Sequence, residues 1–308
     1  MDGLLVIDKP VGPTSHDVVA RMRRLLGERR IGHTGTLDPD ASGVLPLVIG
    51  RATRLARFLS SSDKTYEATI RLGFSTDSYD ASGKAVGDVW TGPWPSHEVV
   101  ASALDAFRGE FVQQPPAFSA KKVQGRRSYK IARAAGSGRS HDGDRMGSGR
   151  VPHPVPVRVD RLDLVAAQGD TLKLLIDCSA GFYVRSLAHD LGQRLGTGAH
   201  LTALRRTRSG DLALADAIDV LAAERDPRAT RAQVRPMESM LPGLSAAVLT
   251  SAGARHAAQG RDLSRTDFES PSAATDGLVR LLDQTGHLVG IAEPAKGPGI
   301  LHPMVILM

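Results

Sequence analysis

The sequence has 308 residues, which is enough for one large domain and one small domain, or for two domains of medium size. Its 39 Lys and Arg residues against 33 Asp and Glu give a net charge of +6, which suits a polyanionic partner without identifying one. The single cysteine, Cys178, excludes an internal disulfide, and no apolar run is long enough for a membrane span or a signal-peptide core, so we expect a soluble, cytoplasmic protein.

The first seventy residues contain four segments with clear patterns. Residues 3–10, GLLVIDKP, predict a short buried strand that ends at Pro10. Residues 15–27, SHDVVARMRRLLG, predict an amphipathic helix capped by Ser15 and ended by Gly27. The apolar run 44–50 follows a glycine-rich stretch, and a helix is expected within 52–60. Residues 64–73, KTYEATIRLG, alternate in polarity and predict a strand with one buried side.

The middle of the chain alternates between helices and strands. We expect helices at 97–109, 128–136 and 182–196, and strands at 156–167, 171–179 and 198–210. Residues 136–154 are rich in Gly, Ser, Arg and Pro, which predicts a mobile loop. The pattern as a whole indicates a large mixed α/β domain.

The composition of the sequence changes after residue 211, where it becomes rich in alanine and charged residues. From residue 242 onward a compact α+β pattern is expected, with a hairpin that turns at 284–286 and a final strand at 299–307. We therefore divide the chain into a domain at 1–235 and a smaller one at 242–308.

Several common kinds of catalytic site lack their sequence signature. The ten histidines and the one cysteine show no spacing typical of metal ligands. Neither a phosphate-binding glycine loop, nor a dinucleotide-binding motif, nor a nucleophile elbow for serine is present. We therefore expect no metal site.

The stretch GHTGTLDPDASG, residues 32–43, has two interpretations. In the first it is a glycine-rich loop in which Asp38 closes a turn before Pro39. In the second Pro39 holds Asp38 in an extended conformation and the glycines allow close approach of a substrate, so that the carboxylate serves as a nucleophile or general base. Taken alone, the stretch favours the turn.

Two other residues are candidates for a site around Asp38. Arg185 begins a helix whose apolar stripe is buried, so it is either a solvated arginine or the cation that keeps a buried carboxylate ionised. Tyr66 lies on the apolar face of its strand, so it is either a core residue or a platform on which a base stacks. These alternatives stay open at the level of residue patterns.

A basic block without acidic residues precedes the predicted loop. It contains Lys121, Lys122, Arg126, Arg127, Lys130 and Arg133. Such a run is either a solvated face or a set of contacts to a phosphate backbone. Further positive side chains that suit the same role are Arg21, Arg23, Arg24, Arg205, Arg206 and Arg208.

Five ordered blocks resemble the bacterial tRNA pseudouridine-55 synthase family, the TruB type. They are GLLVIDKPVGPTSHDVV, GHTGTLDPDASGVLPLVIGRATR, KTYEATIRLG, SAGFYVRSLAHDLG and GAHLTALRRTRSG, within residues 3–210. The resemblance implies an α+β catalytic domain around a central, mainly antiparallel sheet. It also implies an RNA-clasping insertion at about 119–154 and, by size and strand pattern, a PUA-like RNA-binding domain at 242–308.

The same resemblance implies an activity and assigns roles. The enzyme would isomerise the uridine of the TΨC arm of tRNA (position 55) to pseudouridine by base flipping, without cofactor or metal. The implied roles are catalysis for Asp38, pairing with that aspartate for Arg185, stacking on the flipped base for Tyr66, support of the opened arm for His33, and lining of the pocket for Tyr183 and Leu204. Whether Asp38 attacks C1′, attacks C6 or removes the C2′ proton stays open.

Two alternatives share these blocks. The first is a guide-RNA-dependent synthase, but such proteins commonly carry basic tails and depend on partner subunits, so we expect a stand-alone enzyme that needs no guide RNA and no protein partner. The second is a non-catalytic RNA-binding protein with the same fold. The joint presence of Asp38, Tyr66 and Arg185 argues against it, because binding alone does not require the carboxylate.

Overall fold

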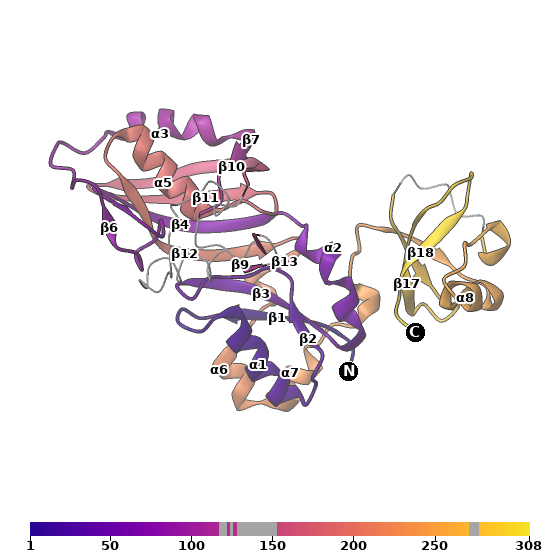
Figure 1. The fold of residues 1–308 in the computed structure, drawn as a ribbon. Helices are drawn as coiled ribbons and strands as arrows, with labels where there is room; N and C mark the ends of the chain where they lie inside the picture. Colours follow the sequence, from indigo (N-terminus) through magenta and orange to yellow (C-terminus); the bar gives the residue numbers. More distant parts are fainter. Residues whose placement is uncertain (117–121, 124–125, 128–152, 271–276) are drawn as a thin grey trace, which may run out of the picture.

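The computed structural model describes residues 1–116, 122–123, 126–127, 153–270 and 277–308 (Figure 1). Its main element is a ten-stranded sheet whose path runs β14-β1-β3-β12-β4-β11-β10-β7, with β2 paired to β3 and β13 paired to β12. The strands are β1 (Gly3–Lys9), β2 (Ile31–His33), β3 (Ala41–Ile49), β4 (Lys64–Leu72), β7 (Gly109–Gln113), β10 (Val155–Gln168), β11 (Thr171–Cys178), β12 (Ala199–Ser209), β13 (Leu212–Ala213) and β14 (Ile218–Asp219). Among the described pairings of this sheet, only β12–β3 and β1–β14 are parallel, so the mainly antiparallel sheet is confirmed.

The helices of the large domain cover the two ends of this sheet (Figure 1). They are α1 (Ser15–Leu26), α2 (Ala56–Ser60), α3 (His97–Leu104), α5 (Val184–Leu195), α6 (Val220–Arg225) and α7 (Pro227–Ala232), with short 3-10 turns η1 (Gly50–Leu55), η2 (Asp105–Phe107) and η3 (Leu214–Asp216). Helices α1 and α6 pack against the β1–β3 end, whereas α3 and α5 pack against β4, β10 and β11. Two small hairpins complete the domain, β5 (Ser75–Thr76) with β6 (Ala85–Val86), and β8 (Lys122–Val123) with β9 (Arg126–Arg127).

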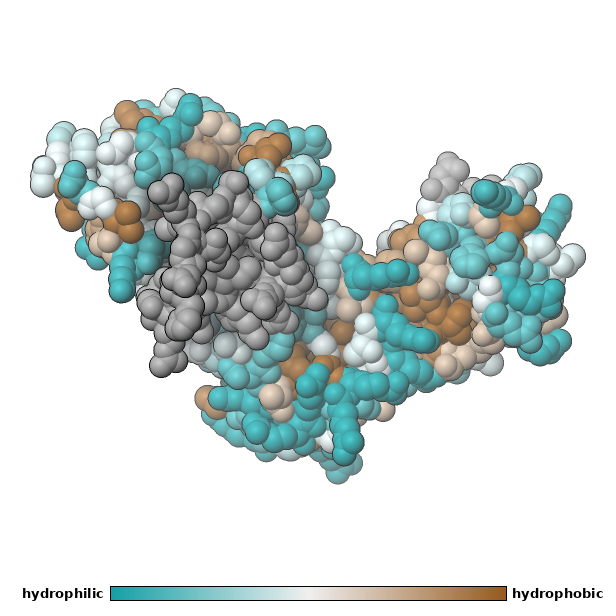
Figure 2. Space-filling model, viewed as in Figure 1, coloured by the Kyte–Doolittle hydropathy of each residue, from teal (hydrophilic) through white to brown (hydrophobic). Residues whose placement is uncertain are grey.

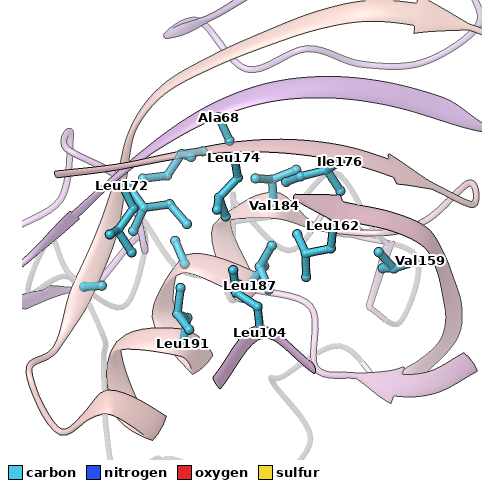
Figure 3. Close-up of a cluster of buried hydrophobic side chains, with 14 of the residues drawn as sticks. Ala68, Leu104, Val159, Leu162, Leu172, Leu174, Ile176, Val184, Leu187 and Leu191 are labelled. Atoms are coloured by element: carbon cyan, nitrogen blue, oxygen red, sulfur yellow. The ribbon is translucent and has the colours of Figure 1, made fainter. Parts of the chain in front are cut away.

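The apolar stripe of α5 lies on the buried side of the sheet (Figure 3). Leu187 and Leu191 are fully buried against Leu174 and Ile176 of β11. Gly196 ends the helix in the left-handed conformation (φ +72°) that glycine adopts without strain. Burial of this stripe fixes the height and rotation of α5, and thereby the place of the polar residues at its first turn.

One predicted helix cap is wrong. Thr14, not Ser15, caps α1, because its side chain accepts from the amide of Asp17 while the Asp17 carboxylate accepts from Thr14. Ser15 is buried, and its hydroxyl donates to the carbonyl of Leu37 (3.0 Å) and accepts from the Leu37 amide (2.9 Å). The neighbouring threonine was available for capping, so this serine instead ties α1 to the glycine-rich stretch.

Residues after 242 form a second, four-stranded sheet with its own core. Its elements are β15 (Ser245–Val248), α8 (Ser251–Ala258), η5 (Arg265–Asp267), β16 (Val279–Leu282), β17 (Leu288–Pro294) and β18 (Leu301–Ile306), preceded by η4 (Met237–Ser239). The expected hairpin turn lies between β16 and β17. Figure 2 shows hydrophobic residues on the part of the small domain that faces the large one. Beneath the surface, Ile291 and Leu307 share a core cluster with Leu4 and Val48 of the large sheet.

Three further expectations concern the rest of the chain. The predicted helix at 52–60 is the 3-10 turn η1 followed by the single turn α2. The helix at 128–136 and the mobile loop at 136–154 lie outside the described residues, except for the last two positions of the loop. Among the described helices none is long and apolar enough to cross a membrane.

Candidate active site

A pocket of about 270 Å³ opens where β12 joins the two ends of the sheet. The strand register explains which residues meet there. Leu204 of β12 pairs with Ala41, near the end of the glycine-rich stretch, and with Ala68 of β4, while Arg206 pairs with Tyr66. The first turn of α5 closes the pocket. The resemblance assigned catalytic or substrate-binding roles to six residues. Five of them line the pocket, namely Asp38, Tyr66, Tyr183, Arg185 and Leu204.

Asp38 closes a turn and also presents its carboxylate to the pocket, while its chemical role stays a prediction. Its carbonyl accepts from the amide of Ala41 (3.1 Å) and so closes a turn. Its carboxylate faces the pocket, where the side chain stays 45% exposed. The loop is fixed from two sides, by the Ser15 contacts to Leu37 and by Lys9, whose ammonium donates to the carbonyl of Pro39 (3.3 Å). Turn geometry therefore serves to present the carboxylate.

Arg185 is not a solvated helix residue, because its side chain is only 9% exposed and contacts two carboxylates. Its Nε lies 3.1 Å from Oδ2 of Asp38, and its Nη1 lies 3.4 Å from Oδ2 of Asp80. Nη1 also donates to the carbonyl of Ser78 (3.2 Å). The guanidinium thus bridges the glycine-rich stretch and the turn at 76–83.

Asp80 was not identified from the sequence. Its Oδ1 accepts from the hydroxyls of Ser78 and Ser82 (2.6 Å each) and from the Ser82 amide, which leaves Oδ2 directed at Arg185. The residues TDSYDASG around it are typical of a turn, and they carry no sign of the long-range contact to α5.

The electrostatic balance at Asp38 has opposing contributions. Burial within the walls of the pocket raises the pKa of its carboxyl group, and the negative charges of Asp80 and Asp40 act in the same direction. The positive charges of Arg185 and Lys9 oppose this rise. Removal of Arg185 would therefore leave a carboxylate that is harder to ionise.

Tyr66 is both a core residue and a wall of the pocket. Its ring packs against the hydrophobic clusters on both sides, and burial raises the pKa of its phenol, opposed by the neighbouring Arg206. Arg206 is only 1% exposed; it donates to the carbonyls of Val44 (2.7 Å) and Gly35 (3.1 Å). It belongs to the pocket floor, so its expected role as a surface contact to phosphate is wrong.

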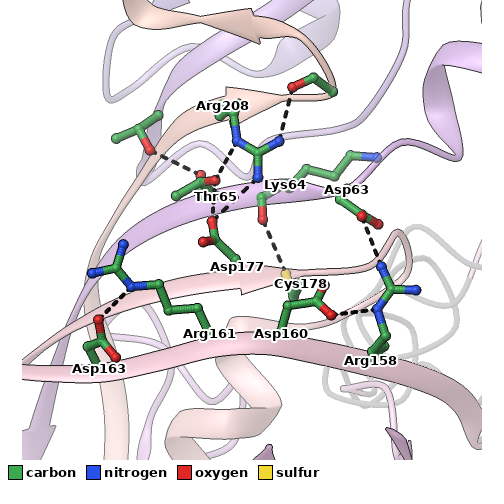
Figure 4. Close-up of polar contacts among 12 residues, drawn as sticks. Asp63, Lys64, Thr65, Arg158, Asp160, Arg161, Asp163, Asp177, Cys178 and Arg208 are labelled. Atoms are coloured by element: carbon green, nitrogen blue, oxygen red, sulfur yellow. Dashed lines mark hydrogen bonds and ion pairs between the residues drawn. The ribbon is translucent and has the colours of Figure 1, made fainter. Parts of the chain in front are cut away.

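The arginines next to it are tied to acidic partners. Arg205 pairs with Asp8 (2.6 Å), and Arg208 lies 3.5 Å from Asp177 and donates to the hydroxyl of Thr65 (Figure 4). These partners neutralise much of the charge that the sequence suggested for phosphate binding on this strand.

A buried lysine adds a positive group to the pocket wall. Lys64 is 6% exposed, and its ammonium donates to the carbonyls of Ser60 (2.8 Å) and Ser62 at the end of α2. Burial lowers its pKa to about 8. Together with Arg185 and Arg206 it makes the pocket lining predominantly cationic.

The remaining predicted residues are placed as follows. His33 ends β2 outside the pocket lining, and its ring meets the ring of His16 edge to face at 5.2 Å. Tyr183 precedes α5; the buried Gln113 side chain accepts from its amide (2.8 Å) and donates to its carbonyl (3.0 Å). Sequence reasoning missed Gln113, because nothing in its neighbourhood predicts that an amide at the end of β7 faces α5.

The basic block falls partly outside the described residues. This applies to Lys121, Lys130 and Arg133, whereas Lys122, Arg126 and Arg127 have a described backbone in the β8–β9 hairpin. Within the described parts of the chain, no group of three or more His, Cys, Asp or Glu side chains could hold a metal ion.

Comparisons with known proteins agree on one family. The family model described as TruB family pseudouridylate synthase (N terminal domain) matches residues 23–184, and the model of the tRNA pseudouridylate synthase B C-terminal domain matches residues 185–242. The tRNA pseudouridine synthase B of Solibacter usitatus is 44% identical over 313 residues, covering 100% of each chain. That of Mycobacterium tuberculosis H37Rv is 42% identical and covers 94% of this chain and 91% of its own.

Two solved structures share the fold across nearly the whole chain. The Cbf5 complex with Nop10 and Gar1 contains a chain that aligns with a TM-score of 0.71 and 26% identity, covering 99% of this chain and 85% of that one. An H/ACA RNP bound to a substrate RNA containing 2'-deoxyuridine gives 0.70 and 25% over the same shares.

Proposed function

The chain belongs to the TruB family of pseudouridylate synthases, and from this premise we propose that it isomerises uridine to pseudouridine in tRNA, acting on position 55 of the TΨC arm. The observation that carries the proposal is the Asp38 carboxylate, which faces a pocket and is paired with the buried Arg185 at 3.1 Å. Relatives that match over the full length bear the name tRNA pseudouridine synthase B.

The reaction explains the residue types in the pocket. The N1–C1′ bond breaks, the uracil turns, and C5 joins C1′ while the C5 proton leaves and N1 gains one, so no redox partner or second substrate is required. Asp38 acts as the nucleophile or base, and Arg185 keeps it ionised. Each of the three steps open to Asp38, namely attack at C1′, attack at C6 or removal of the C2′ proton, needs an ionised carboxylate.

Extraction of the base from the RNA stack has a cost that the pocket offsets. Flipping costs a few kcal/mol, and stacking on an aromatic side chain is worth roughly 1 to 3 kcal/mol per base. Tyr66 supplies that surface, and Tyr183 and Leu204 line the space for the base. His33, which is outside the lining, supports the opened arm.

We assign RNA binding to regions around this pocket. Residues 1–235 form the catalytic domain, the insertion at about 119–154 clasps the RNA with its basic block, and residues 242–308 form a PUA-like RNA-binding domain. The protein acts alone, without guide RNA. Support comes from the relatives named tRNA pseudouridine synthase B, which the chain matches over their full or nearly full length, although the aligned solved structures are an H/ACA RNP and a Cbf5–Nop10–Gar1 complex.

The test uses Asp38→Asn, which keeps the size of the side chain and removes its charge. The variant should bind unmodified tRNA with a dissociation constant within about threefold of the wild type, while single-turnover formation of pseudouridine falls below detection. Asp163→Asn is the matched control, because Asp163 pairs with Arg161 on the exposed side of β10 (Figure 4). Turnover by Asp38→Asn with weakened binding would contradict the proposal and favour a non-catalytic RNA-binding protein.

A further inference from the structure

The turn at 76–83 places a tyrosine in an unusual backbone conformation beside the pocket. Tyr79 has φ +67°, a left-handed value that bulky L residues rarely adopt. Among the described residues only Leu241 shares a positive φ without being glycine. A residue keeps a strained backbone conformation only where contacts with its surroundings stabilise that conformation. The contacts of Tyr79 therefore indicate which part of the structure depends on it.

The ring of Tyr79 stacks on the ring of His189 from α5. The ring centroids lie 3.9 Å apart, and the planes differ by 14°. His189 follows Arg185 by four residues, so both side chains lie on the same face of α5. Nδ1 of His189 is buried and has no hydrogen-bond partner among the described residues, and burial lowers the pKa of its imidazole. Burial thus favours the uncharged form of the imidazole that stacks on Tyr79.

The backbone of Tyr79 is fixed on its other side by β12. The amide of Leu201 donates to the carbonyl of Tyr79 (3.0 Å), and the amide of Ala81 donates to the carbonyl of Leu201 (2.9 Å). This two-point contact ties the turn to the strand that carries Leu204 of the pocket. Tyr79 is thus held between β12 and α5.

The residues on either side of Tyr79, Ser78 and Asp80, both contact Nη1 of Arg185. The carbonyl of Ser78 lies 3.2 Å from that nitrogen, and Oδ2 of Asp80 lies 3.4 Å from it. A left-handed residue between them reverses the chain, so that both groups meet one end of the guanidinium. The other end, Nε, is left for Asp38 at 3.1 Å.

We propose that the Tyr79–His189 stack is a positioning pair that sets the orientation of Arg185 toward Asp38, and hence the rate of the chemical step. The inference rests on the proposed function. The pair does not line the pocket. It acts through the turn, which fixes one end of Arg185, and through α5, which carries the same arginine.

The test removes each ring in turn. Tyr79→Gly accepts the left-handed backbone but lacks the ring, and His189→Leu keeps an apolar side chain without stacking. Each should lower the single-turnover rate constant at least tenfold, with the dissociation constant for tRNA within twofold of the wild type. The double variant should lose little more than either single one, because both substitutions break the same contact. Tyr79→Phe should restore the rate to within threefold of the wild type.

The matched control is Leu241→Gly, which removes a large side chain from a left-handed position next to the small domain. It should leave the rate constant within twofold. If thermal melting shows that Tyr79→Gly does not fold, the rate constants of His189→Leu and His189→Phe are compared instead. His189→Phe keeps a ring at this position and should restore the rate that His189→Leu loses. An active wild type with ring-less variants within threefold of its rate would overturn the inference, as would a loss of rate matched by a loss of tRNA affinity. An inactive wild type would instead refute the proposed function.

Discussion

Replacement of Arg185 by glutamine tests the electrostatic role of the arginine at the pocket. The substitution keeps a polar but shorter side chain at the first turn of α5 and removes the charge that contacts both Asp38 and Asp80. The repulsion between the two carboxylates is then no longer offset by the arginine, and Lys9 is left as the more weakly acting cation near Asp38. We expect the pKa of Asp38 to rise above a value that burial already raises.

The magnitude follows from the separation of the charges. Two unit charges 3.1 Å apart, as for Arg185 Nε and Asp38 Oδ2, attract by about 1.3 kcal/mol in bulk water and by about 5 kcal/mol at an effective dielectric constant of 20. Because 45% of the Asp38 side chain is exposed, solvent screening favours the lower part of this range. A loss of about 1.5 to 3 kcal/mol corresponds to a rise in the pKa of about 1 to 2 units.

The assay is single-turnover pseudouridine formation between pH 5 and 8.5, followed by release of a labelled hydrogen from C5 of the target uridine. The reaction needs the ionised carboxylate, so the rate falls as the pH drops through the pKa of Asp38. In Arg185→Gln the midpoint of this fall should lie about 1 to 2 pH units higher than in the wild type, with a lower plateau from lost orientation.

The control is Arg208→Gln, which makes the same chemical change at a pair with Asp177 outside the pocket (Figure 4). Its midpoint should match that of the wild type. A pH midpoint in Arg185→Gln that is unchanged or lower would refute the electrostatic role. Arg185 would then act only by orienting the Asp38 carboxylate.

Three further predictions concern stacking, packing and RNA affinity. Tyr66→Phe keeps the stacking surface and should retain the rate within about threefold, whereas Tyr66→Ala should lose roughly 5- to 150-fold in single-turnover rate; equal effects of the two variants would exclude stacking. Leu187→Ala, at a fully buried position of α5, should lower the free energy of unfolding in urea by about 2 to 5 kcal/mol, and a loss below 1 kcal/mol would contradict the packing described for the helix. Neutralisation of Lys121, Lys122, Arg126 and Arg127 should lower tRNA affinity and flatten its salt dependence; an unchanged slope would make the block a solvated face.

Periodic segments could be predicted from the sequence because burial of one face dictates their pattern. The alternation in β4 and the apolar stripe of α5 specified both elements, and Gly196 specified the end of the helix. A capping residue was harder to place, since Thr14 and Ser15 are chemically equivalent for that role. Only the long-range contact of Ser15 with Leu37 separates them.

The pocket was predictable for a different reason, namely the match of five sequence blocks to one family. Residue patterns alone left Asp38 and Arg185 undecided, because the ion pair joins positions that are far apart in the chain. The same limit explains the errors and omissions. Arg206 looks like a surface cation until the pairing of β12 with β3 buries it, and the contacts of Asp80 and Gln113 with the start of α5 depend on the tertiary fold.

The most direct measurement is incubation of the purified protein with an unmodified tRNA transcript and no guide RNA, followed by mapping of pseudouridine at nucleotide resolution. We expect one modified site, the TΨC-arm uridine at position 55, in the wild type and none with Asp38→Asn. Absence of product with the wild type, or product that appears only when guide RNA or partner proteins are added, would contradict it.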